Sequence, residues 1–292
     1  MPESHDPRLT PARADVAAAH LRGQVEAARF TEGITHRVIR PRAPVTARPD
    51  ADASLSTELL SGEGFTVYDA AEGWAWGQAD GDGYVGFVPT SALGPDDTPA
   101  THRVSVPATH IYPAPDLKTR PRERLPMGAQ VTVPVSDKQA GFVCLTNEAG
   151  WIYARHLVPI GQQWGQPLDV AMGFLGAPYL WGGRTADGID CSGLVQMALM
   201  AAGIACPRDT DMQAAALAER LSADARVQAG DLVYFPGHVG FMVDETHMLH
   251  ANATHMAVTI NPLTDVVDSV RRDLAARRVD RPPVTCVIRL TP

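Results

Sequence analysis

Cys191 is the residue of this chain that is best placed to act as a nucleophile. It stands directly before LVQMALMAAG (194–203), an apolar run whose composition predicts a helix ending at Gly203. The partial positive charge at a helix N-terminus stabilises a thiolate, so we expect a lowered pKa for the Cys191 thiol. Unpaired backbone N–H groups of the first turn could bind the oxyanion of a tetrahedral intermediate. A buried structural cysteine is the commoner case for a single Cys, and only the residues downstream argue against it.

A thiol nucleophile needs a base, and His238 has suitable surroundings. It lies in GHVGF (237–241), where small neighbours leave an imidazole room to face a cleft. His250 ends the next predicted strand, twelve residues later. A hairpin with this offset can place both rings on one sheet face, so we expect His250 to hydrogen-bond His238 and fix its tautomer. The remaining histidines are predicted to be core or surface residues: His5, His20, His36, His102, His110, His156, His247 and His255.

The elements that must position these residues follow position 163. The run 194–203 and DMQAAALAERL predict two helices. Four later runs, DLVYFPG, HVGFMVDE, HMLHANA and VTCVIRL, predict consecutive strands. This order predicts an α+β domain in which helices pack on an antiparallel sheet.

Upstream, short β-prone runs separated by Pro, Gly and Asp predict small barrels. The plan occurs twice, since GYVGFVPTSAL (83–93) aligns with GWIYARHLVP (150–159). Repeats of about sixty residues resemble tandem bacterial SH3-like barrels, with a single larger β domain as the alternative. Thr10 and Pro11 predict the start of a helix over 11–30. The predicted domains are a helical segment at 1–33, barrels at 34–97 and 98–161, and the α+β domain at 162–292.

Composition narrows the classes of partner. The 292 residues are 45% hydrophobic and 20% charged, as in globular proteins, and carry a formal net charge of -8. Nucleic acids and anionic membranes both require a basic face, so we expect neither as a partner. The first thirty residues contain no signal-peptide run, which predicts a cytoplasmic protein. The cysteines lack metal-ligand spacing, so no metal is expected, and three are predicted to be buried apolar residues: Cys144, Cys206 and Cys286.

Five motifs occur in one order: Y-x-W-G-G, D-C-S-G, G-D-L-V-x-F, H-V-G and a closing L-H-A. Together they resemble the NlpC-type cell-wall cysteine peptidases, circularly permuted relatives of papain, over roughly residues 163–292. The resemblance implies a catalytic set of Cys191, His238 and His250. It also assigns the hydroxyl of Tyr179 to the oxyanion site, with packing beneath the loop as the alternative.

The segment PRDTDMQ resembles one branch of that family, the γ-D-glutamyl-L-diamino acid endopeptidases. The resemblance makes Asp209, with Thr210 beside it, the anchor for a substrate's free amine, because a carboxylate is the right partner for an ammonium. A helix N-cap is an equally weighted role for either residue. Arg208 would pair with a substrate carboxylate or with a neighbouring acid. By resemblance, three further residues contact the substrate, two near γ-D-Glu and one as an apolar wall: Asp190, Ser192 and Trp181.

In this branch the first SH3-like domain closes one end of the cleft. Tyr84, in Gly-Tyr-Val-Gly, fits the tyrosine that contributes there. An acidic residue of the same domain fits the second contact to the amine. Glu63, in L-L-S-G-E, is the predicted residue, and Glu58 fits the position nearly as well.

The resemblance therefore implies a cofactor-free, monomeric cysteine endopeptidase. It would cut the γ-D-glutamyl–diamino acid bond of short peptidoglycan stem peptides that begin with a free L-Ala, in wall-peptide recycling. Two alternatives stay open: an exported hydrolase of intact peptidoglycan with wall-binding barrels, and a non-catalytic protein that binds wall peptides.

Overall fold

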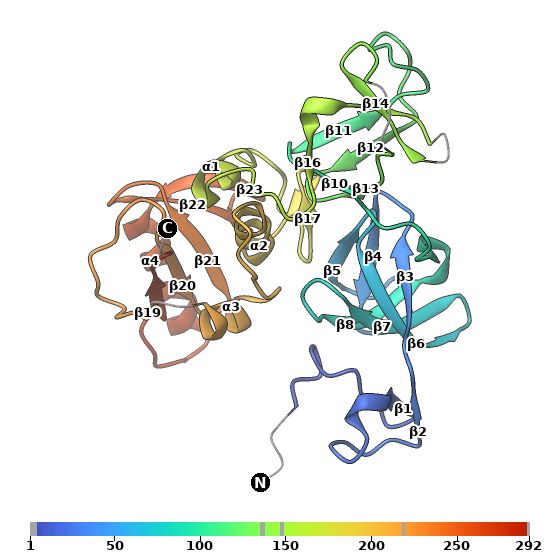
Figure 1. Cartoon of the computed structure of the whole chain (residues 1–292). Coiled ribbons are helices and arrows are strands. Elements are labelled where there is room, and N and C mark those ends of the chain that lie inside the picture. Colours follow the sequence, from blue (N-terminus) through green and yellow to red (C-terminus); the bar gives the residue numbers. More distant parts are fainter. Residues whose placement is uncertain (1–4, 135–137, 147–148, 218–219, 291–292) are drawn as a thin grey trace. The chain divides into compact units, whose positions relative to one another are not determined.

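The computed structural model describes residues 5–134, 138–146, 149–217 and 220–290 (Figure 1). The chain divides into two compact units, Met1–Gln162 and Gln163–Pro292, each of which is described by itself. The first is β-rich and SH3-like, and the second combines helices with an antiparallel sheet, so the predicted α+β class is confirmed. Among the described residues, none of the helices combines the length and apolarity that crossing a bilayer requires.

The first unit contains a seven-stranded antiparallel sheet with the strand order β5-β4-β8-β7-β6-β3-β9. Its core includes Val45 of β4, Leu59 of β5 and Phe65 of β6, all of which are buried. Glu72 and Gly73 both have positive φ in the two-residue turn between β6 and β7, the backbone that a tight hairpin favours. The strands are β3 (Ile34–Val38), β4 (Arg42–Thr46), β5 (Leu55–Leu60), β6 (Gly64–Ala71), β7 (Trp74–Ala79), β8 (Val85–Pro89) and β9 (Leu93–Pro95).

The rest of this unit, from His102, has a hydrophobic cluster of its own that includes Val104, Leu125 and Ile152. Three small sheets surround it, with the orders β13-β10-β16, β11-β12 and β14-β15. Its strands are β10 (His102–Val104), β11 (Ala108–Ile111), β12 (Glu123–Pro126), β13 (Gln130–Val131), β14 (Phe142–Cys144), β15 (Trp151–Tyr153) and β16 (Leu157–Pro159).

The helix predicted over residues 11–30 is wrong. Strand β1 (Val16–Ala18) pairs in parallel with β2 (Arg29–Thr31), and the segment between them begins with a short 3-10 turn, Ala19–Leu21. All three residues of β1 are fully buried, an arrangement that suits a strand covered on both sides.

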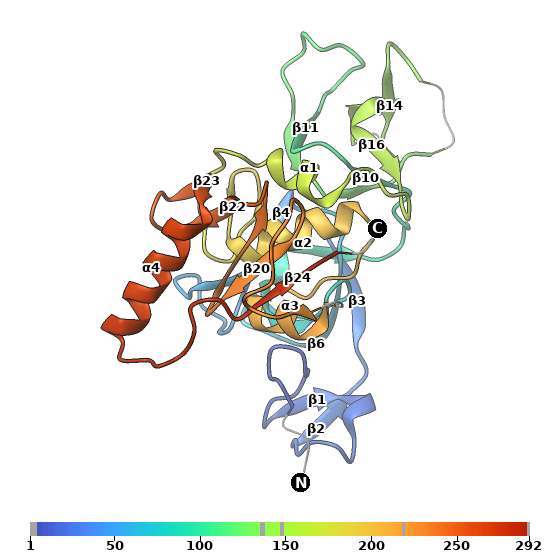
Figure 2. The same cartoon turned by 90° about the vertical axis from the view of Figure 1, so that its left-hand side faces the viewer.

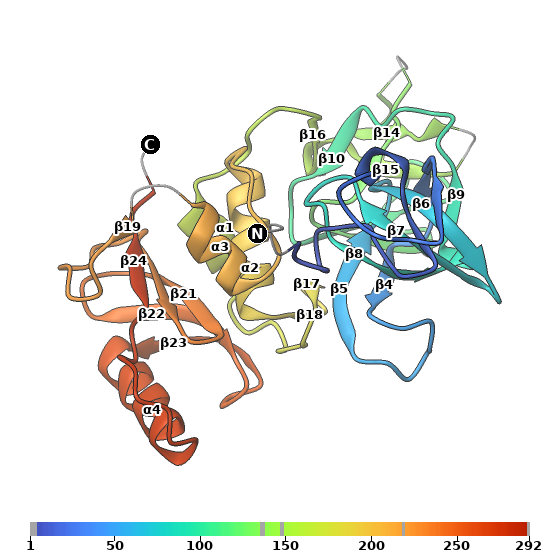
Figure 3. The same cartoon turned by 90° about the horizontal axis from the view of Figure 1, so that it is seen from below.

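The second unit is built on a six-stranded sheet with the order β19-β24-β20-β21-β22-β23. Helix α4 lies on one face of this sheet and α1 to α3 on the other (Figures 2 and 3). Val266 of α4 joins a core cluster with Val233, Met242 and Met248 of the sheet. The helices are α1 (Pro167–Met172), α2 (Cys191–Ala201), α3 (Thr210–Ala216) and α4 (Leu263–Ala276). The strands are β17 (Arg184–Thr185), β18 (Gly188–Ile189), β19 (Arg220–Leu221), β20 (Leu232–Phe235), β21 (His238–Met242), β22 (His247–Asn252), β23 (Ala257–Pro262) and β24 (Cys286–Ile288).

Candidate active site

Cys191 is the first residue of α2, as the sequence predicts. The helix begins there because the Asp190 side chain accepts a hydrogen bond of 2.7 Å from the backbone N–H of Gly193, an N-cap interaction. Gly193 allows a close approach to the preceding loop, since a Cβ at this position would lie 2.4 Å from the carbonyl oxygen of Gly183. The sulfur atom is therefore fixed at a tightly packed helix start.

Burial raises the pKa of the Cys191 thiol to about 12, and the negative charge of Asp190 acts in the same direction. The backbone N–H groups of Val239 and Ser192 and the guanidinium of Arg208 partly oppose this rise. The lowered thiol pKa expected from the helix position is therefore wrong. Only 7% of the surface of Cys191 is exposed. Desolvation destabilises its thiolate more than the helix start stabilises it, so the resting thiol keeps its proton.

His238 begins β21, next to Val239, whose backbone N–H bonds the Cys191 sulfur. Its Nε2 lies 2.7 Å from Nδ1 of His250, so the structure brings together the two histidines that the sequence pairs. Burial, followed by the neighbouring His250, lowers the pKa of His238 to about 3. The imidazole is thus neutral at physiological pH, as a general base must be.

Gly240 makes room for this pair. The register of β21 and β22 sets Phe241 opposite Leu249, which puts Gly240 beside His250. A Cβ on Gly240 would lie 2.6 Å from the Leu249 carbonyl oxygen and 2.8 Å from Cβ of His250. His238 and His250 are diagonal neighbours across the two strands, and the missing side chain between them lets their rings meet.

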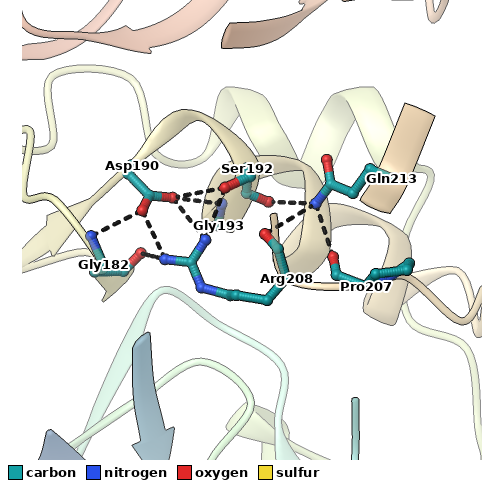
Figure 4. A network of polar contacts seen from close by, with 8 residues as sticks. Gly182, Asp190, Ser192, Gly193, Pro207, Arg208 and Gln213 are labelled. Atoms are coloured by element: carbon teal, nitrogen blue, oxygen red, sulfur yellow. Dashed lines mark hydrogen bonds and ion pairs between the residues drawn. The ribbon is translucent and has the colours of Figure 1, made fainter. Parts of the chain in front are cut away.

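Asp190 is the centre of a buried polar network (Figure 4). The guanidinium of Arg208, whose side chain is fully buried, donates to both of its carboxylate oxygens at 2.9 and 2.7 Å. Arg208 also donates to the hydroxyl of Ser192 at 2.7 Å, and Gly182 N–H donates to Asp190 at 2.8 Å. A substrate carboxylate and a neighbouring acid were the two predicted partners of Arg208. In the structure it pairs with the neighbouring acid, Asp190.

Gln213 extends the network, although no role was predicted for it. Its amide nitrogen donates to the carbonyl oxygens of Ser192 and Pro207 at 3.0 and 2.9 Å. Its oxygen accepts from the hydroxyl of Tyr234 at 3.3 Å, inside the core. The spacing P-R-D-x-x-x-Q, which ends at this residue, was the available signal. Gln213 ties the segment before α3 to the residue that follows Cys191.

Tyr179 lies close enough to Cys191 to interact with it electrostatically. It forms a bridge with Ile189 and donates its backbone N–H to Met256 at 2.9 Å. Burial, followed by electrostatic interaction with Cys191 and Asp190, raises the pKa of its hydroxyl to about 12. A phenol that keeps its proton is the form that can donate to an oxyanion.

The other predicted substrate contacts of this unit lie in the loop after Tyr179 and at the start of α3. Trp181 is two-thirds exposed. Asp209 is half-buried at the N-cap position of α3, but its side chain makes no capping hydrogen bond there. Thr210 is the first residue of α3. Amine binding by Asp209 stays a prediction.

Three predicted contacts belong to the first unit, and their part in a cleft stays a prediction. The Glu63 carboxylate accepts from the backbone N–H of Leu60 at 2.9 Å, in the turn between β5 and β6. Glu58, within β5, is buried and pairs with Arg42. Tyr84 is buried just before β8.

Comparison with known proteins identifies both units. Residues 176–274 match the NlpC/P60 family, and residues 45–93 match the bacterial dipeptidyl-peptidase Sh3 domain. The chain is 29% identical over 241 residues to the gamma-D-glutamyl-L-lysine dipeptidyl-peptidase of Bacillus subtilis, a match covering 74% of this chain and 78% of that protein. It is 36% identical over 108 residues to dipeptidyl-peptidase 6 of Lysinibacillus sphaericus, covering 37% of this chain and 40% of that protein.

The fold is also similar to the crystal structure of an NlpC/P60 family protein from Bacillus cereus, with a TM-score of 0.71 at 18% identity. That match covers 88% of this chain and 100% of the other, and at this identity it shows the fold alone. The two domain matches, the long alignment and the shared fold agree with each other. The second unit therefore contains an NlpC/P60 cysteine peptidase domain, and the first contains a bacterial SH3 domain.

Proposed function

We propose that this peptidase hydrolyses the γ-D-glutamyl–L-diamino acid bond of short peptidoglycan stem peptides that carry a free N-terminal L-Ala. The similarity to a gamma-D-glutamyl-L-lysine dipeptidyl-peptidase over 74% of the chain supports the substrate class. The observation that carries the chemistry is the neutral His238, bonded to His250 at 2.7 Å and adjacent to the residue whose backbone N–H holds the Cys191 sulfur.

In the resting enzyme the Cys191 thiol and the His238 imidazole are both neutral, and the reaction starts from this state. Nε2 of His238 is taken by His250, so Nδ1 accepts the thiol proton as the Cys191 sulfur attacks the γ-carbonyl carbon. The hydroxyl of Tyr179 donates to the developing oxyanion. The C–N bond then breaks, and the proton on His238 passes to the leaving amine. Water, deprotonated by His238, hydrolyses the thioester and restores the thiol.

Recognition of the free amine would come from a carboxylate. Asp209 is half-buried at the start of α3 and directly follows Arg208, which bonds the residue after Cys191, and this position supports its assignment as the amine anchor. An acylated N-terminus would leave that carboxylate without its charged partner, and such a loss strongly disfavours binding. Selection for free N-termini fits a cytoplasmic role in the recycling of wall peptides.

The test compares L-Ala-γ-D-Glu-L-Lys and L-Ala-γ-D-Glu-diaminopimelate with their N-acetylated forms, with cleavage products separated by chromatography. We expect release of the diamino acid from the free peptides, a loss of at least about 100-fold in kcat/KM on acetylation, and no activity in Cys191→Ala. Equal cleavage of free and acetylated peptides would overturn the amine recognition. Cleavage of intact peptidoglycan in preference to the tripeptides would overturn the recycling role.

A further inference from the structure

We propose that Asn261 is a positioning residue of the catalytic pair: with Thr259 and Asn252 it sets which ring nitrogens of His250 and His238 carry a proton. The inference rests on the proposed role of His238 as general base. A neutral imidazole has one protonated and one bare nitrogen, and only a bare Nδ1 on His238 can take the thiol proton. The side chains of β22 and β23 supply a hydrogen-bond chain with a defined direction.

The direction starts at Asn252. Its Oδ1 accepts a hydrogen bond of 2.9 Å from the backbone N–H of His255, and a backbone N–H can only donate. The amide nitrogen of Asn252 therefore faces the other way, toward the Ala257 carbonyl oxygen and the hydroxyl of Thr259. It donates to that hydroxyl at 2.8 Å. The side chain of Asn252 is buried and cannot turn over without breaking the backbone bond.

Thr259 continues the series of hydrogen bonds in the same donor-to-acceptor direction. Its oxygen accepts from Asn252, and its single hydrogen is directed at Oδ1 of Asn261, 2.6 Å away. That separation is typical of an O–H···O bond and shorter than the usual N–H···O bond. The oxygen of the Asn261 amide thus faces Thr259, and its nitrogen faces His255 at 3.4 Å.

The same Asn261 oxygen lies 3.0 Å from Nε2 of His250. A carbonyl oxygen only accepts, so Nε2 of His250 carries the proton. Burial lowers the pKa of His250, which keeps its ring neutral and its Nδ1 bare. Nδ1 then accepts from Nε2 of His238 at 2.7 Å.

This order leaves Nδ1 of His238 without a proton. That nitrogen has no hydrogen-bond partner within the described part of the chain. If the Asn261 amide were reversed, its NH₂ group would donate to His250, both rings would switch tautomer, and Nδ1 of His238 would hold a proton. His238 could then not deprotonate the thiol, so the orientation of one amide decides whether the base works.

The direct test is the protonation of each ring nitrogen, read by long-range ¹H–¹⁵N spectra of the full chain with ¹⁵N-labelled histidine in the Cys191→Ala background. His238→Gln identifies the His238 signals. We expect a protonated Nε2 and a bare Nδ1 on His238. Asn261→Leu should give a mixture of tautomers, whereas Asn261→Asp should keep the native one, because a carboxylate only accepts. A protonated Nδ1 in the native chain, or an unchanged spectrum in Asn261→Leu, would overturn the proposal.

Kinetics on L-Ala-γ-D-Glu-L-Lys provide a second readout. Asn261→Leu should lower kcat about tenfold or more with KM changed less than about twofold, and Asn261→Asp should recover most of kcat. Ile260→Val, exposed on the same strand, is the control. If Asn261→Leu does not fold, Thr259→Val tests the same series of hydrogen bonds. The expected tautomer without tripeptide cleavage would refute the proposed substrate and leave this inference standing.

Discussion

Replacement of Arg208 by Met should destabilise the peptidase unit. The substitution keeps an unbranched apolar stem but removes the cation from a site where the Arg208 side chain is 0% and the Asp190 side chain 10% exposed. Leaving one member of a buried ion pair without its partner costs about 3–5 kcal/mol. Asp190 would retain the N–H bonds of Gly182 and Gly193, so we expect the lower end, about 3 kcal/mol.

Hydrogen exchange of the α2 backbone amides in the full chain, followed by mass spectrometry, measures this loss. A cost of about 3 kcal/mol raises the fraction of open molecules, and so the exchange rate, by about 100-fold. Arg226→Met is the matched control, because its ion pair with Glu245 is exposed to solvent and contributes little.

The double variant Asp190→Asn/Arg208→Met separates charge from packing. It removes both charges, so its exchange should be closer to that of the native chain than the product of the two single effects. The reasoning is refuted if Arg208→Met exchanges within about threefold of the Arg226→Met control.

Three further predictions concern Cys191, His238 and Gly240. Because burial raises the pKa of the Cys191 thiol to about 12, its alkylation by iodoacetamide should accelerate about tenfold per pH unit from pH 6 to 9; a rate that is constant over this range would mean a preformed thiolate. Since the pKa of His238 is lowered to about 3, the unfolded state binds more protons between about pH 6.5 and 3. The free energy of unfolding should fall by up to about 1.4 kcal/mol per unit as the pH drops through this window, and denaturant titrations of His238→Gln should lack that part. Gly240→Ala should push His250 away and lower kcat by at least about tenfold, whereas Gly81→Ala, where a Cβ meets nothing within 4 Å, should have native kinetics.

Local patterns in the sequence were enough to predict several features. The apolar run after Cys191 predicts α2. The twelve-residue offset between His238 and His250 on neighbouring strands predicts that their rings meet, as they do in the structure. The family, the α+β class and the cysteine-peptidase activity could be predicted because the motifs are specific and short in range.

Features that depend on tertiary burial could not be read in the same way. The helix expected at 11–30 is replaced by a parallel pairing of β1 and β2, which no local periodicity reveals. The direction of the Cys191 pKa shift depends on how completely the sheet and α2 exclude water from the sulfur. The ion pair of Arg208 joins residues eighteen positions apart, and only the fold decides between that partner and a ligand.

Peroxides attack thiolates far faster than protonated thiols, and the oxidation they start becomes irreversible beyond the sulfenic acid. An enzyme whose nucleophile is held in its protonated form is therefore chemically quiet whenever the substrate is absent. The desolvation of Cys191 therefore predicts that peroxide oxidises this thiol more slowly than a cysteine that rests as a thiolate.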